Sequence, residues 1–146
     1  MQPILPQPTV SVRRGVVVVV SDAERLLVIR RSEFVVAPRK HCFPGGHIEP
    51  GESEVDAVVR EFREELGGQV RPRERLWESV SPRGVHLAWW TAHLVDPTLP
   101  LSPNPAEVEA AFWCTLAEMA ALPDLLDSNG AFLAALRAGE IRWVGR

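Results

Sequence analysis

The chain has 146 residues, a formal net charge of −3, and 46% hydrophobic residues. This length is most simply one domain spanning residues 1–146, large enough to bury a core without added staples. The modest negative charge gives no support to a general nucleic-acid-binding role, so we expect no stable nucleic-acid partner. Cys42 and Cys114 are too few and too far apart for a disulfide framework or a zinc site, which is typical of a cytoplasmic protein.

The N-terminal part of the chain predicts a tail followed by a hairpin. Residues 1–10 contain several prolines, and we expect them to form a flexible tail. The apolar run Val16–Val20 is too short for a signal-peptide core or a membrane span, so no membrane association is expected. Its β-branched residues predict a strand buried on both faces. Leu26–Ile29 follows polar turn residues and predicts the second strand of a hairpin.

The most regular helical pattern lies in the middle of the chain. Phe43-Pro44-Gly45-Gly46 predicts the end of a strand followed by a turn. A helix is predicted from Glu54 to Leu66, with Ser53 as its N-cap and Gly67-Gly68 at its end. One face of this helix is expected to pack in the core through its regularly spaced apolar residues: Val55, Val58, Val59, Phe62 and Leu66.

Three further strands are predicted downstream. Arg71–Val80 and His86–Val95 flank a turn that contains proline and glycine, which favours an antiparallel pair. Val108–Cys114 follows a proline-rich loop and predicts another strand. With the helices around them, these strands indicate a mixed sheet flanked by helices.

Two short helices are predicted near the C-terminal end. Thr115 and Glu118 have the spacing of a capping box for the first of them. Asp127 or Ser128 is expected to cap the second, and Gly139 is expected to end it.

The middle helix carries three carboxylates on one flank. At about 100° per residue, Glu61, Glu64 and Glu65 point away from the apolar stripe and lie close together. Glu61 and Glu65 are a like-charge pair one turn apart, which costs a few tenths of a kcal/mol in a bare helix. That cost is too small to require a ligand. A solvated acidic face, relieved by Arg60 and Arg63, is therefore the plain alternative to a metal site.

The spacing around this helix points to a specific kind of site. Gly46 is followed after five residues by Glu52, and after seven more by Arg60-Glu61-Phe62-Arg63-Glu64-Glu65-Leu66-Gly67. This segment resembles the box of the Nudix hydrolases, and every fixed polar and glycine position of that box is present. The one departure is Gly68, where the box has an aliphatic residue, and we expect this glycine to loosen packing at the helix end.

Segments on either side of the box extend the resemblance. Phe43–Gly46 is similar to the Pro-Gly-Gly entry that is usual in this family, and Leu27–Arg31 is similar to the strand that precedes it. Glu107–Leu116 resembles the start of the usual C-terminal strand and helix. His41 stands where family members often have an aromatic residue, commonly tryptophan.

The resemblance implies an α/β protein, a Nudix-type α/β/α sandwich with a mixed β-sheet. It also implies hydrolysis of a nucleoside diphosphate linked to another group, through attack of water on phosphorus with the help of Mg²⁺ or Mn²⁺. The expected partner is thus a small-molecule nucleotide. Dimers are common in such proteins, so the resemblance leaves a homodimer open.

Carried onto this sequence, the box implies a metal site with these ligands: Gly46 through its carbonyl, Glu52 as a support or for a second ion, and Glu61, Glu64 and Glu65. Hard divalent cations prefer such oxygen ligands. Arg60 would orient a carboxylate through a bidentate ion pair, and the catalytic group is expected to comprise Arg60, Glu61 and Glu64.

Basic residues that precede the box are candidates for phosphate binding. Arg30, Arg31, Arg39 and Lys40 stand where a phosphorylated substrate is expected to arrive, and the alternative is that they are solvated charges.

The sequence leaves the general base, the class of function and the particular substrate open. The general base is either a box carboxylate or one outside it, for which Glu107 and Glu109 are the candidates. The chain could also be a regulatory domain that binds a nucleotide without turnover, or an isomerase of isoprenoid diphosphates. No residue pattern identifies the particular nucleotide.

Overall fold

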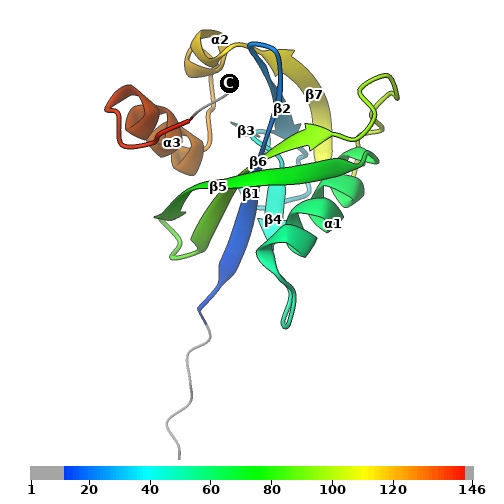
Figure 1. Ribbon diagram of the computed structural model, residues 1–146, viewed down its shortest axis with the longest axis horizontal. Coiled ribbons are helices and arrows are strands. Elements are labelled where there is room, and N and C mark those ends of the chain that lie inside the picture. The colour runs from blue at the N-terminus through cyan, green and yellow to red at the C-terminus, as the bar shows by residue number, and fades with distance from the viewer. Residues whose placement is uncertain (1–11, 144–146) are drawn as a thin grey trace, which may run out of the picture.

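The computed structural model describes residues 12–143, so the expected tail at residues 1–10 lies outside the described part of the chain. Figure 1 shows a central sheet with helices on both sides. In chain order the elements are β1 (Arg14–Asp22), β2 (Arg25–Arg31), β3 (His41–Cys42), β4 (Gly45–His47), α1 (Glu54–Leu66), β5 (Val70–Val80), β6 (His86–Leu94), β7 (Val108–Cys114), α2 (Leu116–Ala120) and α3 (Asp127–Arg137).

The sheet is mixed and is centred on β1. This strand pairs in parallel with β6, and antiparallel with β4 and, at its end, with β2. The predicted antiparallel pairing of β5 with β6 is confirmed, and β2 also pairs antiparallel with β3 and β7. The expected α/β/α sandwich with a mixed sheet is confirmed.

The two faces of β1 belong to two different parts of the core. Val16, Val18 and Val20 pack in the cluster that includes the buried face of α1. Val17 and Val19 point to the opposite side and pack in the cluster that includes α3. Alternation of side chains along a strand puts neighbouring valines on opposite faces, which explains why the whole run is apolar.

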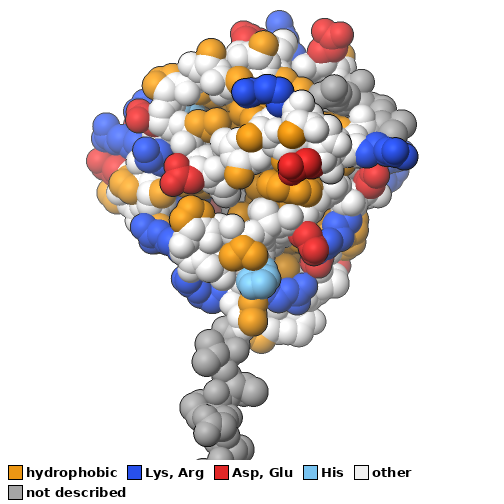
Figure 2. Space-filling model, turned by 90° about the vertical axis from the view of Figure 1, so that its left-hand side faces the viewer, with side chains coloured by type: hydrophobic (Ala, Val, Ile, Leu, Met, Phe, Trp, Pro, Cys, Tyr) orange, Lys and Arg blue, Asp and Glu red, His pale blue; other side chains and the backbone are white. Residues whose placement is uncertain are grey.

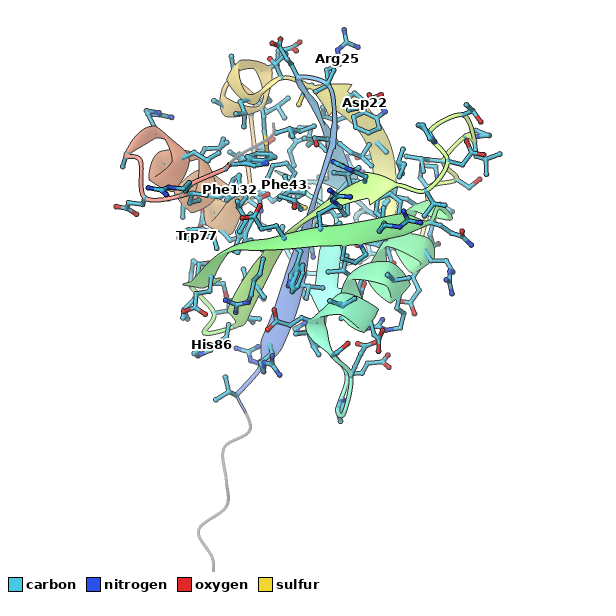
Figure 3. All side chains as sticks on the ribbon, viewed as in Figure 1. Asp22, Arg25, Phe43, Trp77, His86 and Phe132 are labelled. Carbon is cyan, nitrogen blue, oxygen red and sulfur yellow. The ribbon has the colours of Figure 1, made fainter. Side chains whose placement is uncertain are left out.

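Aromatic side chains fill the core between the sheet and α3 (Figure 3). The rings of Trp89 and Phe132 stack with centroids 4.6 Å apart and an interplanar angle of 2°. Phe43 packs edge-on against both of these rings, and Trp77 lies tilted beside them. Offset and edge-on arrangements of this kind are the favoured geometries of aromatic pairs. This cluster fixes α3 against the sheet.

The buried face of α1 differs from the predicted one. Val55 is 40% exposed, whereas Ala57 and Glu65 are buried. The helix is rotated so that part of its acidic flank packs against β4, where the main-chain N–H of Gly45 donates to Glu65 Oε1 at 2.8 Å. The predicted N-cap is confirmed, because Ser53 Oγ accepts a hydrogen bond from the N–H of Asp56 at 3.0 Å.

The end of α1 is closely packed, which makes the expectation for Gly68 wrong. A Cβ atom at Gly68 would lie 2.8 Å from Leu101 Cδ2 and 3.0 Å from Phe62 Cε1. The proline-rich loop therefore supplies, through Leu101, the apolar group that an aliphatic residue at position 68 would have supplied. The N–H of Ser102 also donates to the carbonyl of Leu66 at 2.7 Å, which satisfies a carbonyl at the helix end.

The two C-terminal helices begin in different ways. The capping box of Thr115 and Glu118 is confirmed, with both reciprocal hydrogen bonds formed. The predicted caps of α3 are wrong, because the N-cap is Leu126 and makes no side-chain hydrogen bond. Asp127 is the first helical residue, and Ser128 is turned inward. Among residues 12–143, no helix is long and apolar enough to cross a membrane.

Candidate active site

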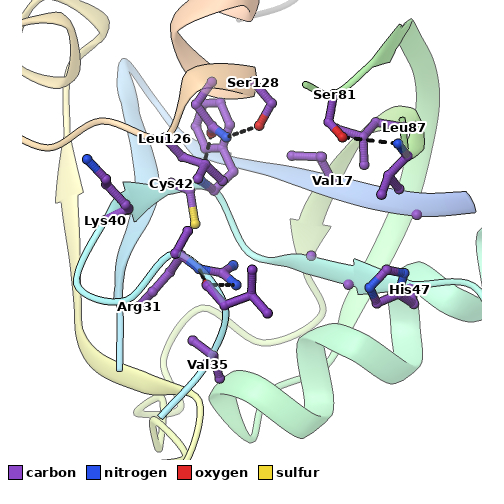
Figure 4. Close-up of a pocket in the computed structure, with 18 of the residues that line it drawn as sticks. Val17, Arg31, Val35, Lys40, Cys42, His47, Ser81, Leu87, Leu126 and Ser128 are labelled. Atoms are coloured by element: carbon purple, nitrogen blue, oxygen red, sulfur yellow. Dashed lines mark hydrogen bonds between the residues drawn. The ribbon is translucent and has the colours of Figure 1, made fainter. Parts of the chain in front are cut away.

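A pocket of about 520 Å³ opens beside the box segment. It is bounded by β4, the acidic flank of α1, the loop of residues 32–40 (the β2–β3 loop), the β5–β6 turn and the start of α3 (Figure 4). Figure 2 shows the side of the molecule toward which α3 and the β5–β6 turn project. On this face, apolar side chains lie toward the centre and charged side chains lie mostly toward the margin. The pocket lining combines charged residues, such as Glu61 and Lys40, with apolar ones, such as Val35 and Leu87.

Arg60 holds three of the box carboxylates. Its Nε and Nη2 donate to the two oxygens of Glu52 at 2.7 and 2.8 Å. Its Nη1 donates to Glu61 at 2.9 Å and to Glu64 at 3.1 Å, and Nη2 also reaches the carbonyl of His47 at 2.9 Å. The hydrogen bonds from Arg60 lower the pKa of Glu52 to about 2. The expected bidentate pair therefore exists, and the carboxylate that it fixes is Glu52.

Two glycines allow the helix carboxylates to approach the strand. A Cβ atom at Gly46 would overlap the carboxylate of Glu61, and one at Gly45 would overlap the carbonyl of Val16. The absence of side chains at both positions lets the Glu61 carboxylate lie against the backbone of β4. It also allows the hydrogen bond from Gly45 to Glu65 that buries the second carboxylate. This close approach explains why Gly45, just before the box, and Gly46, its first position, are both glycines.

Glu107 brings a third carboxylate to the same place from outside the box. Its backbone is fixed by hydrogen bonds from its N–H to the carbonyl of Asn104 (2.9 Å) and from Ser32 N–H to its carbonyl (3.0 Å). Within the described residues, its Oε2 is buried without a hydrogen-bond partner. Glu61, Glu65 and Glu107, which we call the carboxylate cluster, all line the pocket.

The electrostatics of the carboxylate cluster are unfavourable without a counter-charge. The pKa of Glu65 is raised to about 8, chiefly by burial; the Gly45 hydrogen bond opposes this rise, and the nearby charges of Glu61 and Glu107 add to it. Burial also raises the pKa of Glu61, with Arg60 opposing and Glu64 and Glu107 adding to the rise. Like charges that share a buried site disfavour joint ionisation. A cation among these oxygens would remove the conflict.

The carboxylate cluster fits a hard divalent cation. Within residues 12–143 no three acidic, histidine or cysteine side chains are already arranged to hold an ion. Arg60 engages Glu52, Glu61 and Glu64 in this arrangement. The unpartnered buried oxygen of Glu107 and the all-carboxylate donor set nevertheless match the preference of Mg²⁺ and Mn²⁺ for oxygen ligands.

The predicted phosphate-binding residues separate into two pairs. Arg31 and Lys40 line the pocket. Arg30 and Arg39 do not line it, and Arg39 forms an exposed ion pair on the surface of the β2–β3 loop. Arg30 pairs with Glu109 at 3.2 Å. Since this contact places Glu109 outside the pocket as well, only Glu107 of the two predicted bases faces the site.

Sequence reasoning missed the polar end of the pocket at the start of α3. Asn129 is 2% exposed; its Oδ1 accepts from the N–H of Phe43 at 2.9 Å, and its Nδ2 donates to Ser128 Oγ at 3.3 Å. Leu126 and Asp127 line the same end. The one available signal in the sequence is the pair of polar residues Asp127 and Ser128 at the start of an apolar helix, a pattern that also predicts a helix cap.

A model of the NUDIX domain matches residues 11–136. The chain belongs to this family. The complete box, the sandwich fold and the box carboxylates beside the pocket agree with that membership, and the resemblance inferred from the box is confirmed.

Similar proteins include enzymes that act on different substrates. The chain is 31% identical over 115 residues to the NAD-capped RNA hydrolase NudC of Stutzerimonas stutzeri, covering 75% of this chain and 38% of that protein. It is 38% identical over 84 residues to the CTP pyrophosphohydrolase of Escherichia coli, covering 56% of this chain and 59% of that protein. The chain therefore matches less than two thirds of the length of either relative.

The fold is also found in solved Nudix structures. The crystal structure of the MutT protein from Methanosarcina mazei Go1 superposes with a TM-score of 0.73 and 19% sequence identity, covering 88% of this chain and 94% of that one. At this identity the likeness shows the fold.

Proposed function

We propose that this Nudix domain hydrolyses a diphosphate linkage in a nucleoside diphosphate linked to another group, through attack of water on phosphorus. The observation that carries the proposal is the carboxylate cluster: Glu61, Glu65 and Glu107 line one pocket, the Glu61 carboxylate lies against the backbone of Gly46, and Glu65 accepts a hydrogen bond from the N–H of Gly45. The two relatives have names that refer to nucleotide-containing substrates, which supports a nucleotide as the substrate class.

A Mg²⁺ or Mn²⁺ ion would be held by Glu61 and Glu65 of the carboxylate cluster, with Glu52, Glu64 and the carbonyl of Gly46 as further ligands of the box. Such an ion supplies Lewis acidity and neutralises charge on the diphosphate. Arg60 keeps Glu52 and Glu64 in fixed positions through its charge-assisted hydrogen bonds. This preorganisation lowers the cost of arranging the ligands during the reaction.

Glu107 is the residue that we assign as general base. It lines the pocket, and its buried Oε2 has no partner among the described residues, so it is free to accept a proton from the attacking water. The ionised form of this carboxylate is the one that can do so. Lys40 lies at the same pocket and would donate hydrogen bonds to a phosphate of the substrate.

The nucleoside part of the substrate would lie between the start of α3 and the β2–β3 loop, which line the same pocket. That end of the pocket offers the amide of Asn129 and the hydroxyl of Ser128, with the apolar side chains of Val17 and Leu87 nearby. Apolar surfaces with a few fixed polar groups are typical of sites for small organic ligands. The N–H of Phe43 occupies the oxygen of the Asn129 amide, and one amide N–H is donated to Ser128 Oγ, which leaves the second N–H as a donor.

The proposal is tested by a panel of nucleoside diphosphate derivatives with Mg²⁺ and Mn²⁺ compared, scored by product formation. We expect one compound class to be cleaved by the wild-type protein and the Glu65→Gln variant to remain folded without cleaving it. Full activity of Glu65→Gln would contradict the proposed site. Nucleotide binding by calorimetry without turnover of any compound would assign the domain a regulatory role instead.

A further inference from the structure

The β2–β3 loop forms one wall of the pocket in an unusual backbone conformation. Val35, Val36 and Ala37 line the pocket from this loop. Ala37 and Arg39 have φ angles of 53° and 61°, in the left-handed region that residues other than glycine rarely adopt. Such conformations persist only where the surrounding structure holds them. The contacts that hold this loop therefore set the shape of the pocket wall.

Arg31 contacts the loop at three places. Its main-chain N–H donates to the carbonyl of Lys40 at 2.8 Å, and its carbonyl accepts from the N–H of Arg39 at 3.0 Å. Its guanidinium reaches across the loop, where Nε and Nη2 donate to the carbonyl of Val36 at 2.9 and 2.6 Å (Figure 4). One residue thus joins the far end of the loop and its middle to β2.

The other contacts of the loop hold its ends or its surface. Ser32 Oγ accepts from the N–H of Phe34 at 3.2 Å, and Arg30 Nε donates to the carbonyl of Arg39 at 3.2 Å. The ion pair between Arg39 and Glu33 joins side chains that are 54% and 56% exposed, and exposed pairs of this kind contribute little. The guanidinium of Arg31 is therefore the main side-chain contact to the middle of the loop.

We propose that Arg31 is a positioning residue: it fixes the apolar wall formed by Val35–Ala37 and so sets the affinity of the pocket for the nucleoside part of its ligand. The Nε and Nη2 edge of a guanidinium is one that can bind a phosphate in bidentate fashion, and here it is occupied by the carbonyl of Val36. The wall itself carries no charge, which suits a sugar or base. This inference rests on the proposed nucleotide substrate.

The first arm of the test measures order in the loop and needs no ligand. Hydrogen exchange followed by mass spectrometry is compared in wild-type protein, Arg31→Lys and Glu33→Gln. Arg31→Lys keeps the charge but cannot reproduce the paired donors, so exchange in residues 32–40 becomes about tenfold faster while α1 is unaffected. Glu33→Gln, which removes only the exposed ion pair, leaves exchange unchanged. Unchanged exchange in Arg31→Lys overturns the proposal.

The second arm separates positioning from phosphate binding. Calorimetry in the presence of Mg²⁺ measures the affinity of the protein for two ligands. The first is methylenediphosphonate, which lacks a nucleoside. The second is whichever of ADP, GDP, CDP and UDP the wild-type protein binds most tightly. In Arg31→Lys the affinity for the nucleotide falls about tenfold, whereas that for methylenediphosphonate stays within about twofold. In turnover of a cleaved substrate, KM rises and kcat is retained. Equal losses of affinity for both ligands in Arg31→Lys overturn the proposal. If Arg31→Lys loses loop order but the wild-type protein turns over no substrate, the result contradicts the hydrolase function and not the role of Arg31.

Discussion

The carboxylate of Glu61 lies directly against the backbone of Gly46, in space that any side chain at position 46 would occupy. The contact joins α1 to β4 at the floor of the pocket. It shows why a glycine stands at the first position of the box: the carboxylate can reach the pocket only where the strand presents no Cβ atom.

Gly46→Ala is expected to lower kcat/KM by about 100-fold, because the displaced carboxylate can no longer lie where the reaction requires it. Steady-state kinetics measures this effect, and circular dichroism checks the fold. Gly130→Ala is the matched control, since a Cβ atom at this helical position meets nothing within 4 Å. It is expected to raise the free energy of unfolding by up to about 1 kcal/mol and to leave kinetics unchanged. Wild-type kinetics in Gly46→Ala would contradict the close contact.

Arg60→Lys is expected to lower kcat/KM about tenfold or more. Lysine keeps the positive charge but cannot bind Glu52 in bidentate fashion while also reaching Glu61 and Glu64, as Arg60 does. The carboxylates would then lose their fixed positions. Kinetics at several Mg²⁺ concentrations measures the loss, which should persist at saturating metal. Complete recovery at high Mg²⁺ would mean that Arg60 affects metal affinity alone.

Glu107→Gln is expected to lower kcat by about 10²- to 10⁴-fold, the usual contribution of a general base. Without metal, the same variant should melt at a higher temperature than the wild type, because it removes a carboxylate whose charge raises the pKa of both Glu61 and Glu65. Glu109→Gln is the comparison, since Glu109 pairs with Arg30 away from the pocket. If Glu109→Gln loses activity and Glu107→Gln keeps it, the assignment of the base is wrong.

Gly68→Val is expected to lower the free energy of unfolding by about 1–3 kcal/mol, although the family box has an aliphatic residue at this position. The reason is the side chain of Leu101, which occupies the space beside Gly68. Leu101→Ala makes room for the valine, so the double variant should be more stable than the sum of the two single effects predicts. Urea unfolding of the four proteins measures this coupling, and strict additivity would show that the two residues do not compete for space.

Local features of the fold could be predicted from the sequence because their causes lie within a few residues. Ser53 and the pair Thr115 and Glu118 cap their helices as their spacing indicates. The valine run forms a strand buried on both faces for the same reason. The box spacing placed the carboxylates of α1 on one flank, and the structure brings Glu61 and Glu65 to the pocket.

Other features depend on contacts between distant segments. The buried carboxylate of Glu65 accepts a hydrogen bond from Gly45, and Leu101 packs beside Gly68. No local pattern contains either contact. Arg30 and Arg31 are neighbours in sequence, yet only Arg31 lines the pocket, and the register of β2 against β7 shifts between these two residues. Asn129 became visible as a pocket residue only once α3 was placed against Phe43.

Binding of a divalent ion by the carboxylate cluster is tested most directly by titrating Mn²⁺ into the wild-type protein and the Glu61→Gln variant, with turnover of the cleaved nucleotide measured on the same samples. Glu61 supplies a carboxylate that lines the pocket and lies beside Gly46. In the wild-type protein we expect saturable Mn²⁺ binding and metal-dependent turnover. In a folded Glu61→Gln protein we expect no turnover and at least tenfold weaker Mn²⁺ binding, which corresponds to a loss of about 1.4 kcal/mol in binding free energy. Equal Mn²⁺ affinity and equal turnover in the two proteins would contradict the site.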